Sequence, residues 1–212
     1  MSDKALQIAV LLSGSGTTLQ NLIDVIAAGR LNAQIKLVIG SRPELGGLKR
    51  AAAAKIMNFV VDRRQFEGVA RFSRQIFSLC DDAQVDLICL AGWLSLLEIP
   101  DNYAQKVMNI HPALLPSFGG KGMYGRHVHE AVLAHGCKVS GCTVHFVDGT
   151  YDSGPIIVQR TCPVEENDTP QTLAARVFAE EKIAYPEAIA LFAEKRLQFE
   201  GRKVRILPIP AS

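Results

Sequence analysis

The 212-residue sequence predicts an α/β fold, with a mostly parallel twisted sheet flanked by helices and an antiparallel C-terminal portion. In the first half, short apolar runs alternate with helical periodicities, which is typical of βαβ units. In the second half, two strand-like segments follow each other across a short turn, which favours antiparallel pairing. The content of 48% hydrophobic and 21% charged residues is that of a folded protein with a sizeable core.

The N-terminal segment has the pattern strand, helix, strand. Two apolar runs predict strands over Leu6 to Leu12 and Ile35 to Ile39. Between them, apolar residues recur every three to four positions and predict a helix that ends near Gly29. The residues with this spacing are Leu19, Leu22, Ile23 and Ile26.

A second set of elements follows. Phe59 to Val61 is predicted as the third strand, and Leu87 to Ala91 as a central strand buried on both faces. A helix is expected between them, because apolar side chains return every three or four residues. These side chains are Val69, Phe72, Ile76 and Cys80.

After Met108 the stretch from Asn109 to Gly125 holds two prolines and five glycines or serines, which predicts a loop. A short helix ending at Gly136 is expected next. Alternation of Cys142, Val144 and Phe146 with Thr143, His145 and Val147 then predicts a strand, which pairs with Ile156 to Gln159 across the turn from Asp148 to Pro155.

The last predicted element is a long helix. It begins at Asp168, Thr169 and Pro170, which are residue types that cap helix N-termini, and it ends or kinks at Pro186. We take residues 1–212 as one domain, with an N-terminal half of about 1–108 and a C-terminal half of about 109–212.

Composition excludes several classes of protein. A net charge of +2, from 23 basic and 21 acidic residues, gives no reason to expect a nucleic-acid groove. No apolar run reaches the roughly 18 residues of a membrane span, and Met1 to Leu12 enters a strand without a cationic leader, so we expect a cytoplasmic protein. The five cysteines form no CxxC pair, so they are expected to be reduced, mostly buried thiols.

A glycine-rich turn is the first candidate site. Leu11 to Thr18 runs from a strand through Gly14 and Gly16 into a helix, so free backbone N–H groups and the helix dipole converge on one point. This arrangement binds anions, although the turn lacks the third glycine of a dinucleotide fingerprint and the lysine of a P-loop. The alternative is a tight turn without a ligand.

Asn109 and His111 form the second candidate, because residues two apart on an extended segment project the same way. An amide can donate to a developing oxyanion and an imidazole can pass a proton, so the pair suits attack on an activated carbonyl. In the alternative, Asn109 caps a turn and His111 meets a backbone carbonyl.

Two carboxylates are candidates for the same site. Asp152 lies on a turn from which it can reach a histidine, raise the pKa of that histidine and orient it, and Asp148 is its rival. Glu181 falls on the apolar stripe of the last helix, where a buried acid needs a partner such as an amine substrate. In the alternatives, Asp152 is an acid on a surface turn, and Glu181 lies at the edge of the stripe with its carboxylate in water.

The remaining candidates are weaker. His127 and His129 are two residues apart on a helix, which places them on different faces and argues against a shared metal. His145 is a candidate for entering the site, and His135 is expected to cap a helix end. Lys121 is either a substrate clamp on a loop or an exposed lysine.

Five motifs in a fixed order resemble those of the phosphoribosylglycinamide formyltransferase family over essentially the whole chain: SGSGTTLQ, LAGWLSLL, NIHPALLP, SGCTVHFV and DSGP. The resemblance implies a Rossmann-like formyltransferase fold. It implies direct transfer of the formyl group of 10-formyltetrahydrofolate to the amine of 5-phosphoribosylglycinamide, through a tetrahedral intermediate and without a metal.

The same resemblance implies the site residues. Asn109, His111 and Asp152 match the catalytic trio. The ribonucleotide would be bound by Gly16, Thr17, Thr18 and Glu181, and the folate by Leu94, Ser95, Leu96, Leu97 and Asn109. The implied partners are these small molecules, with no nucleic acid and no membrane, in a monomer or homodimer. We expect the trio to meet at the mouth of the glycine turn.

Two segments depart from the family pattern. Val69 stands where members often carry a basic folate contact, with Arg71 two residues away, so this contact is left unassigned. Ser117 to Tyr124 reads SFGGKGMY, where many members have a shorter run with proline and histidine.

Competing functions are a formyltetrahydrofolate hydrolase, a methionyl-tRNA formyltransferase and a non-catalytic ligand-binding module. The first usually has an added N-terminal domain and the second a basic C-terminal domain, and we expect neither in a chain that ends at Ser212. An incomplete catalytic trio would favour the third.

Overall fold

A computed structural model describes residues 4–209 of the chain. The described residues form two compact units, of which one extends to Asn109 and the other begins at Ile110. The predicted α/β class is confirmed. That the chain is one domain remains a prediction. Of the segment Met1 to Leu12, for which we expected no cationic leader, the first three residues lie outside the described residues.

The N-terminal unit contains parallel strands in the order β3-β2-β1-β4-β5. They are β1 (Leu6–Leu12), β2 (Ala33–Gly40), β3 (Asn58–Val60), β4 (Leu87–Leu90) and β5 (Val107–His111), the last of which crosses the boundary between the units. All four residues of β4 are buried, because parallel strands carry helices on both faces of their sheet.

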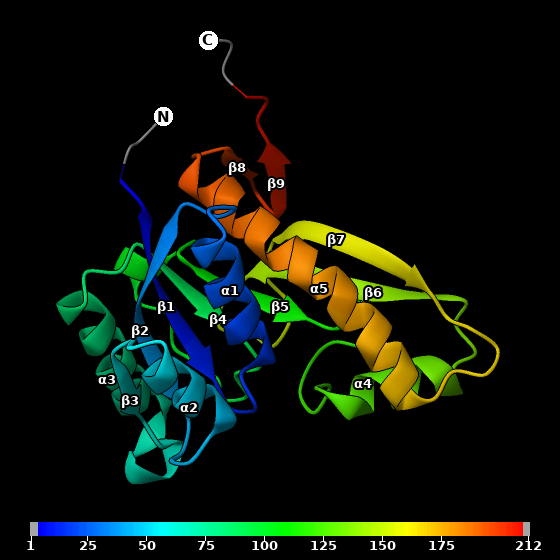
Figure 1. The fold of residues 1–212 in the computed structure, drawn as a ribbon, viewed down its shortest axis with the longest axis horizontal. Helices are drawn as coiled ribbons and strands as arrows, with labels where there is room; N and C mark the ends of the chain where they lie inside the picture. The colour runs from blue at the N-terminus through cyan, green and yellow to red at the C-terminus, as the bar shows by residue number, and fades with distance from the viewer. Residues whose placement is uncertain (1–3, 210–212) are drawn as a thin grey trace. The chain divides into compact units, whose positions relative to one another are not determined.

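Three α-helices belong to this unit: α1 (Thr17–Ala27), α2 (Gly46–Ala53) and α3 (Gly68–Asp82). Helices α1 and α2 contact each other and pack on β2 (Figure 1). The sequence predicted α1 and α3 from their apolar stripes. It did not predict α2, because this helix has only eight residues, begins with two glycines and shows no long stripe. Short 3₁₀ turns lie at Arg63–Gln65 and Asp101–Tyr103.

In the C-terminal unit the strand order is β5-β6-β7, with β6 (Val139–Phe146) antiparallel to β7 (Ile156–Pro163). Helix α4 (Arg126–Ala134) precedes β6, and α5 (Pro170–Ala193) runs along both β6 and β7 (Figure 1). A hairpin of β8 (Leu197–Glu200) and β9 (Lys203–Ile206) completes the described chain.

Four features differ from the prediction. Asn109 to His111 end β5 and do not begin a loop. Strand β6 is buried at every residue from Ser140 onward, because α5 covers one of its faces. The alternation of residue types along β6 therefore does not separate buried from exposed positions. Of the two outcomes predicted at Pro186, an end of the helix is wrong, because α5 continues to Ala193, and a kink stays a prediction. The β8–β9 hairpin was not predicted. The capping prediction is confirmed, since Thr169 and Thr172 form a capping box at the start of α5.

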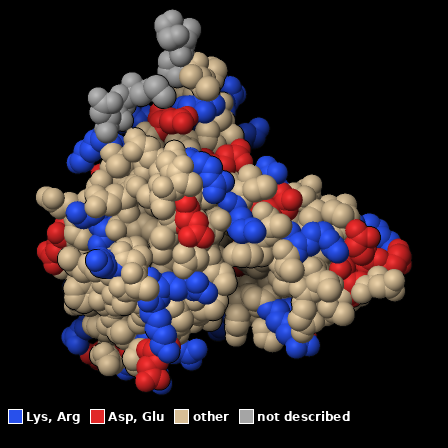
Figure 2. Space-filling model, viewed as in Figure 1, with Lys and Arg blue, Asp and Glu red and all other residues tan. Residues whose placement is uncertain are grey.

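Basic and acidic side chains are interspersed over the face seen in Figure 2, so neither sign of charge dominates this view. Among residues 4–209, no helix is long and apolar enough to cross a membrane.

Candidate active site

His111 ends β5 and is only 3% exposed. Its Nε2 lies 2.8 Å from the backbone oxygen of Phe118, and its Nδ1 lies 3.5 Å from Oδ2 of Asp152. A carbonyl oxygen can only accept a hydrogen bond, so Nε2 carries a hydrogen and Nδ1 faces the carboxylate. His111 therefore meets both a backbone carbonyl, which was the alternative interpretation, and the predicted carboxylate.

Asp152 lies in the connection between β6 and β7, and its side chain is 11% exposed. Its Oδ2 also accepts a hydrogen bond from the Gly120 N–H at 2.9 Å. Its rival Asp148 accepts from the Thr150 N–H at 3.1 Å and so shapes the turn itself. Of the two candidate acids, Asp152 is the one that faces His111.

Burial and charge act in opposite directions on the His111–Asp152 pair. Burial lowers the pKa of His111, against the raising effects of Asp152 and the Phe118 carbonyl. The expectation that the carboxylate raises the pKa of His111 is confirmed for the effect of Asp152 itself, but desolvation of the imidazolium outweighs this attraction and the net pKa is lowered. Burial alone would raise the pKa of Asp152, but the His145 hydrogen bond, the His111 charge and the Gly120 N–H together lower it.

The loop after His111 is held by Thr143 of β6 and Gln159 of β7. Thr143 Oγ1 donates to the Ala113 carbonyl at 2.7 Å and accepts from the Leu115 N–H at 3.0 Å. Gln159 Nε2 donates to the Leu115 carbonyl at 2.9 Å and to Thr143 Oγ1 at 3.0 Å. Sequence analysis did not find this role, although Thr143 stands in a strand position where a buried hydroxyl needs partners.

The segment that carries Asp152 is equally constrained. Asp152 itself has φ 52°, a left-handed conformation that is costly for a residue with a side chain. A Cβ on Gly154 would overlap the Phe146 carbonyl oxygen, so this close approach requires glycine. From the turn between β8 and β9, Arg202 donates a hydrogen bond to the Ser153 carbonyl. Phe199 of β8 packs on Phe146 with ring centroids 4.9 Å apart.

Glu181 lies on α5 between the buried residues Val177 and Ala184 and is itself half-buried. Burial raises the pKa of Glu181 to about 7. Burial, and secondarily the Glu181 carboxylate, raise the pKa of the Cys142 thiol to about 12. Glu180, the residue before Glu181, forms an ion pair with Arg160 at 2.8 Å. Within residues 4–209, no ion pair involves Glu181.

The glycine turn of the N-terminal unit lies where two helices begin. Gly16 caps α1 with φ 76°, and a Cβ on it would overlap Cα of Gly47 in the first turn of α2. The Gly47 N–H donates to the Gly14 carbonyl at 3.2 Å. Within residues 4–109, no side chain caps either helix by a hydrogen bond. In α2 the Gly47 N–H is used by the Gly14 carbonyl, whereas the first turn of α1 keeps backbone donors of the kind that bind anions.

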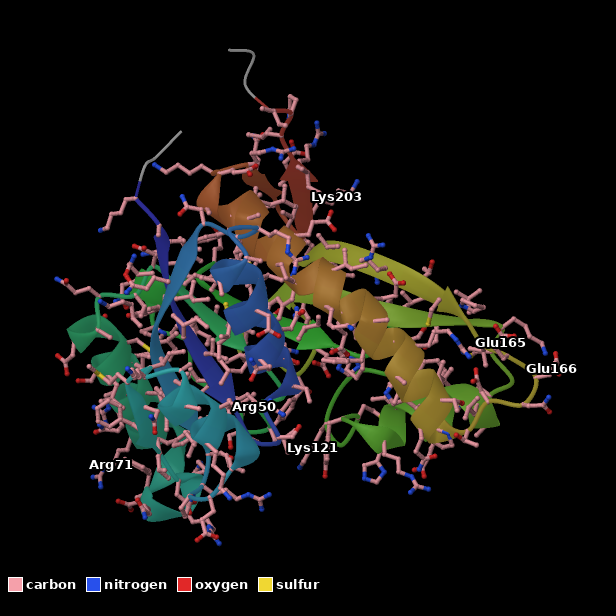
Figure 3. The ribbon with its side chains drawn as sticks, in the orientation of Figure 1. Arg50, Arg71, Lys121, Glu165, Glu166 and Lys203 are labelled. Carbon is pink, nitrogen blue, oxygen red and sulfur yellow. The ribbon has the colours of Figure 1, made fainter. Side chains whose placement is uncertain are left out.

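Arg50 of α2 reinforces this turn. Its Nε donates to the Ser15 carbonyl at 3.0 Å and its Nη1 to Gln20 Oε1 at 3.0 Å. Figure 3 labels Arg50 on α2. Sequence analysis missed the contributions of Gly46, Gly47 and Arg50. The adjacent glycines, which follow Pro43, were the available signal of a helix start.

The predicted folate segment Leu94–Leu97 follows β4 and lies beside the end of β1. The Ser13 N–H donates to the Gly92 carbonyl at 3.0 Å, and Ser13 Oγ accepts from the Leu94 N–H at 3.3 Å. Leu94 is 45% exposed and Leu97 only 2%, while Ser95 and Leu96 are half-buried. The glycine turn and the folate segment are thus joined by direct hydrogen bonds within one unit.

The weaker candidates take the following positions. Arg71 forms an ion pair with Glu67 at 2.9 Å, and Val69 is half-buried. His135 contacts the Ala131 carbonyl through Nδ1 at 2.8 Å, as expected of a cap. Lys121 is exposed on the loop before α4 (Figure 3).

His127 is exposed and His129 is buried, so the two occupy different faces of α4. In the part of the chain that the structure describes, no three side chains of His, Cys, Asp or Glu are arranged to hold a metal ion.

Comparison with known proteins gives consistent matches. The model of the family described as formyl transferase matches residues 6–189. A chloroplastic phosphoribosylglycinamide formyltransferase of Vigna unguiculata is 36% identical over 90% of this chain. A trifunctional purine biosynthetic protein adenosine-3 of Gallus gallus is 39% identical over 91% of this chain. The chain spans 62% of the length of the first relative and 19% of that of the second.

A solved structure gives full-length agreement. Glycinamide ribonucleotide transformylase 1 from Symbiobacterium toebii superposes with a TM-score of 0.90 at 42% identity, covering 96% of this chain and 95% of that one.

Proposed function

Given that this chain belongs to the formyl transferase family, we propose that it transfers the formyl group of 10-formyltetrahydrofolate to the amine of 5-phosphoribosylglycinamide. The products are formylglycinamide ribonucleotide and tetrahydrofolate, in de novo purine biosynthesis. The observation that carries the proposal is the 3.5 Å contact between His111 Nδ1 and Asp152 Oδ2. His111 lies two residues after Asn109 on β5.

The reaction begins with attack of the substrate amine on the formyl carbon, which gives a tetrahedral intermediate with a negative oxygen. The Asn109 amide donates to this oxygen, and protonated His111 stabilises its charge. A single donor of this kind typically contributes roughly 3 kcal/mol to the transition state. Because burial lowers the pKa of His111, the Asp152 carboxylate is needed to stabilise the imidazolium as it forms.

The proton of the attacking amine leaves through water to the His111–Asp152 pair. The intermediate then collapses, the bond between the formyl carbon and the folate nitrogen breaks, and a proton returns to that nitrogen. Because the 3.5 Å contact already orients the imidazole, little rearrangement is required during the reaction.

The remaining site residues bind the two substrates. The ribonucleotide phosphate binds at the turn that contains Gly16, Thr17 and Thr18, where the N-terminus of α1 supplies backbone donors. The Glu181 carboxylate accepts a hydrogen bond from the glycinamide end of the ribonucleotide. The folate contacts Leu94, Ser95, Leu96, Leu97 and Asn109. We further propose a cytoplasmic monomer or homodimer without nucleic-acid or membrane partners.

The test is to mix the purified protein with the ribonucleotide and a 10-formyl folate and to follow formation of the deformylated folate. We expect product only when both substrates are present. Product without the ribonucleotide would indicate a hydrolase, and no product in either case would contradict the proposal. His111→Ala should abolish turnover, whereas His127→Ala, on an exposed position of α4, should not.

A further inference from the structure

Asp152 faces a second histidine. His145 lies on β6 and is only 1% exposed. Its Nε2 lies 3.7 Å from Oδ1 of Asp152, on the carboxylate oxygen that His111 does not face. Its Nδ1 lies 2.8 Å from the backbone oxygen of Phe146. The two histidines, on different strands, thus contact opposite oxygens of one carboxylate.

Hydrogen-bond chemistry fixes what each ring nitrogen of His145 does. The Phe146 carbonyl can only accept, so Nδ1 must carry a hydrogen. In neutral His145 the Nε2 lone pair would then point at the Asp152 carboxylate, so that two acceptors would face each other. With a proton on Nε2, the same contact becomes a charge-assisted hydrogen bond, which is about twice as strong as a neutral one.

The backbone of Asp152 explains why such a contact is needed. Its φ of 52° is strained, and strained residues persist only where their surroundings over-determine them. Oδ2 is held by the Gly120 N–H at 2.9 Å, while Oδ1 faces His145. The hydrogen bond with His145 is also the strongest of the interactions that lower the pKa of Asp152, ahead of the charge of His111.

We propose that His145 is a positioning residue for formyl transfer: by donating from Nε2 to Oδ1 of Asp152, it fixes the carboxylate so that Oδ2 faces His111. This inference rests on the proposed function and extends it. Without the Nε2 donor this oxygen of the carboxylate would lose its support, so turnover depends on the contact with His145 as well as on His111.

Other charged groups surround this cluster. His111 of β5 interacts with both Asp152 and His129 of α4. On α5, Glu180 and Glu181 lie near Cys142, three residues before His145 on β6. From the β8–β9 turn, Arg202 contacts the Ser153 carbonyl.

Two amide substitutions separate the two contacts of His145. In His145→Gln the amide nitrogen takes the place of Nε2 and retains a donor toward Asp152. In His145→Asn it takes the place of Nδ1 and retains only the donor toward the Phe146 carbonyl. We expect the glutamine variant to keep kcat within about threefold of the wild-type value. We expect the asparagine variant to lose about 10- to 100-fold in kcat, at unchanged KM for both substrates.

A purely structural role would give a different pattern. Both variants would then lower the melting temperature alike, and the two would lose kcat to the same extent. That outcome, or full kcat in His145→Asn, would overturn the proposal. His127→Gln, on an exposed position of α4, serves as the histidine control.

A measurement that leaves His145 in place covers the case in which its own variants misfold. The ring ¹⁵N signals of histidine-labelled protein report protonation directly. Those of His145 should change when Asp152→Asn removes the carboxylate charge, and unchanged signals would contradict the proposal. If the wild-type protein transfers no formyl group, the proposed function fails, while this measurement still tests the contact between His145 and Asp152.

Discussion

The glycine turn of the N-terminal unit and the histidine–aspartate cluster of the C-terminal unit differ in the groups that form them. The turn is formed by the backbone: Gly16 caps α1, and the Gly47 N–H of α2 donates to the Gly14 carbonyl. The cluster is formed by side chains, because Asp152 contacts both His111 and His145. A backbone site is sensitive to chain conformation and tolerant of side-chain chemistry, whereas a side-chain site has the opposite sensitivity.

Asp152→Asn should produce the largest effect, because it removes the charge at the centre of the side-chain site. We expect kcat to fall by about 10³-fold or more, with KM for the ribonucleotide nearly unchanged. Steady-state kinetics and circular dichroism would check this result. Asp148→Asn is the matched control, because Asp148 accepts a hydrogen bond from the Thr150 N–H within the same turn. This variant should retain activity. Equal losses in the two variants would contradict the distinction.

Gly16→Ala should be the most damaging small change at the backbone site. The left-handed φ of 76° disfavours any side chain, and the added Cβ would overlap Cα of Gly47. We expect KM for the ribonucleotide to rise by about tenfold, which corresponds to about 1.4 kcal/mol of lost binding, with a smaller change in kcat. Gly14→Ala is the control, because nothing lies within 4 Å of a Cβ at Gly14.

Glu181→Gln tests the one side chain that we expect to bind the ribonucleotide. Because folding raises the pKa of Glu181 from 4.5 to about 7, the wild-type protein loses stability as the pH rises through this interval. The variant should not, so above pH 7 it should be the more stable protein by roughly 1 to 3 kcal/mol, with a higher KM. Denaturation at several pH values would check this, and an identical pH dependence of stability would exclude it.

Thr143→Val should weaken the loop that follows His111. It leaves the buried Leu115 N–H and Ala113 carbonyl without their hydroxyl partner, at a cost of about 1–3 kcal/mol. Turnover should fall by severalfold as the loop loosens. Thr161→Val, at an exposed position of β7, provides the comparison in thermal unfolding. Equal melting temperatures for the two variants would show that the hydroxyl is dispensable.

Ser15→Ala should have the smallest effect. The Ser15 side chain is exposed, and only its backbone carbonyl is used, as the acceptor for Arg50. We expect KM and kcat within about twofold of the wild-type values, since surface substitutions usually cost less than about 0.5 kcal/mol. A tenfold rise in KM would show that the turn binds its ligand through a hydroxyl as well as through the backbone.

Sequence periodicity predicted the elements whose apolar stripes are long, such as α1 and α3. The pairing of Asp152 with His111 came from the family resemblance, because the residues alone left Asp148 as a rival. Periodicity could not predict α2, whose role rests on two glycines that fit between other atoms. It also could not predict that burial of His111 lowers its pKa by more than the charge of Asp152 raises it. These quantities depend on packing, which is not encoded in the spacing of residue types.

The β8–β9 hairpin has a practical consequence for anyone preparing this protein. Arg202 contacts the carbonyl of Ser153, the residue after Asp152, and Phe199 packs on Phe146. Removal of the hairpin would take away both contacts, and with them part of the support of the segment that carries Asp152. Kinetic comparisons are therefore best made with the hairpin intact.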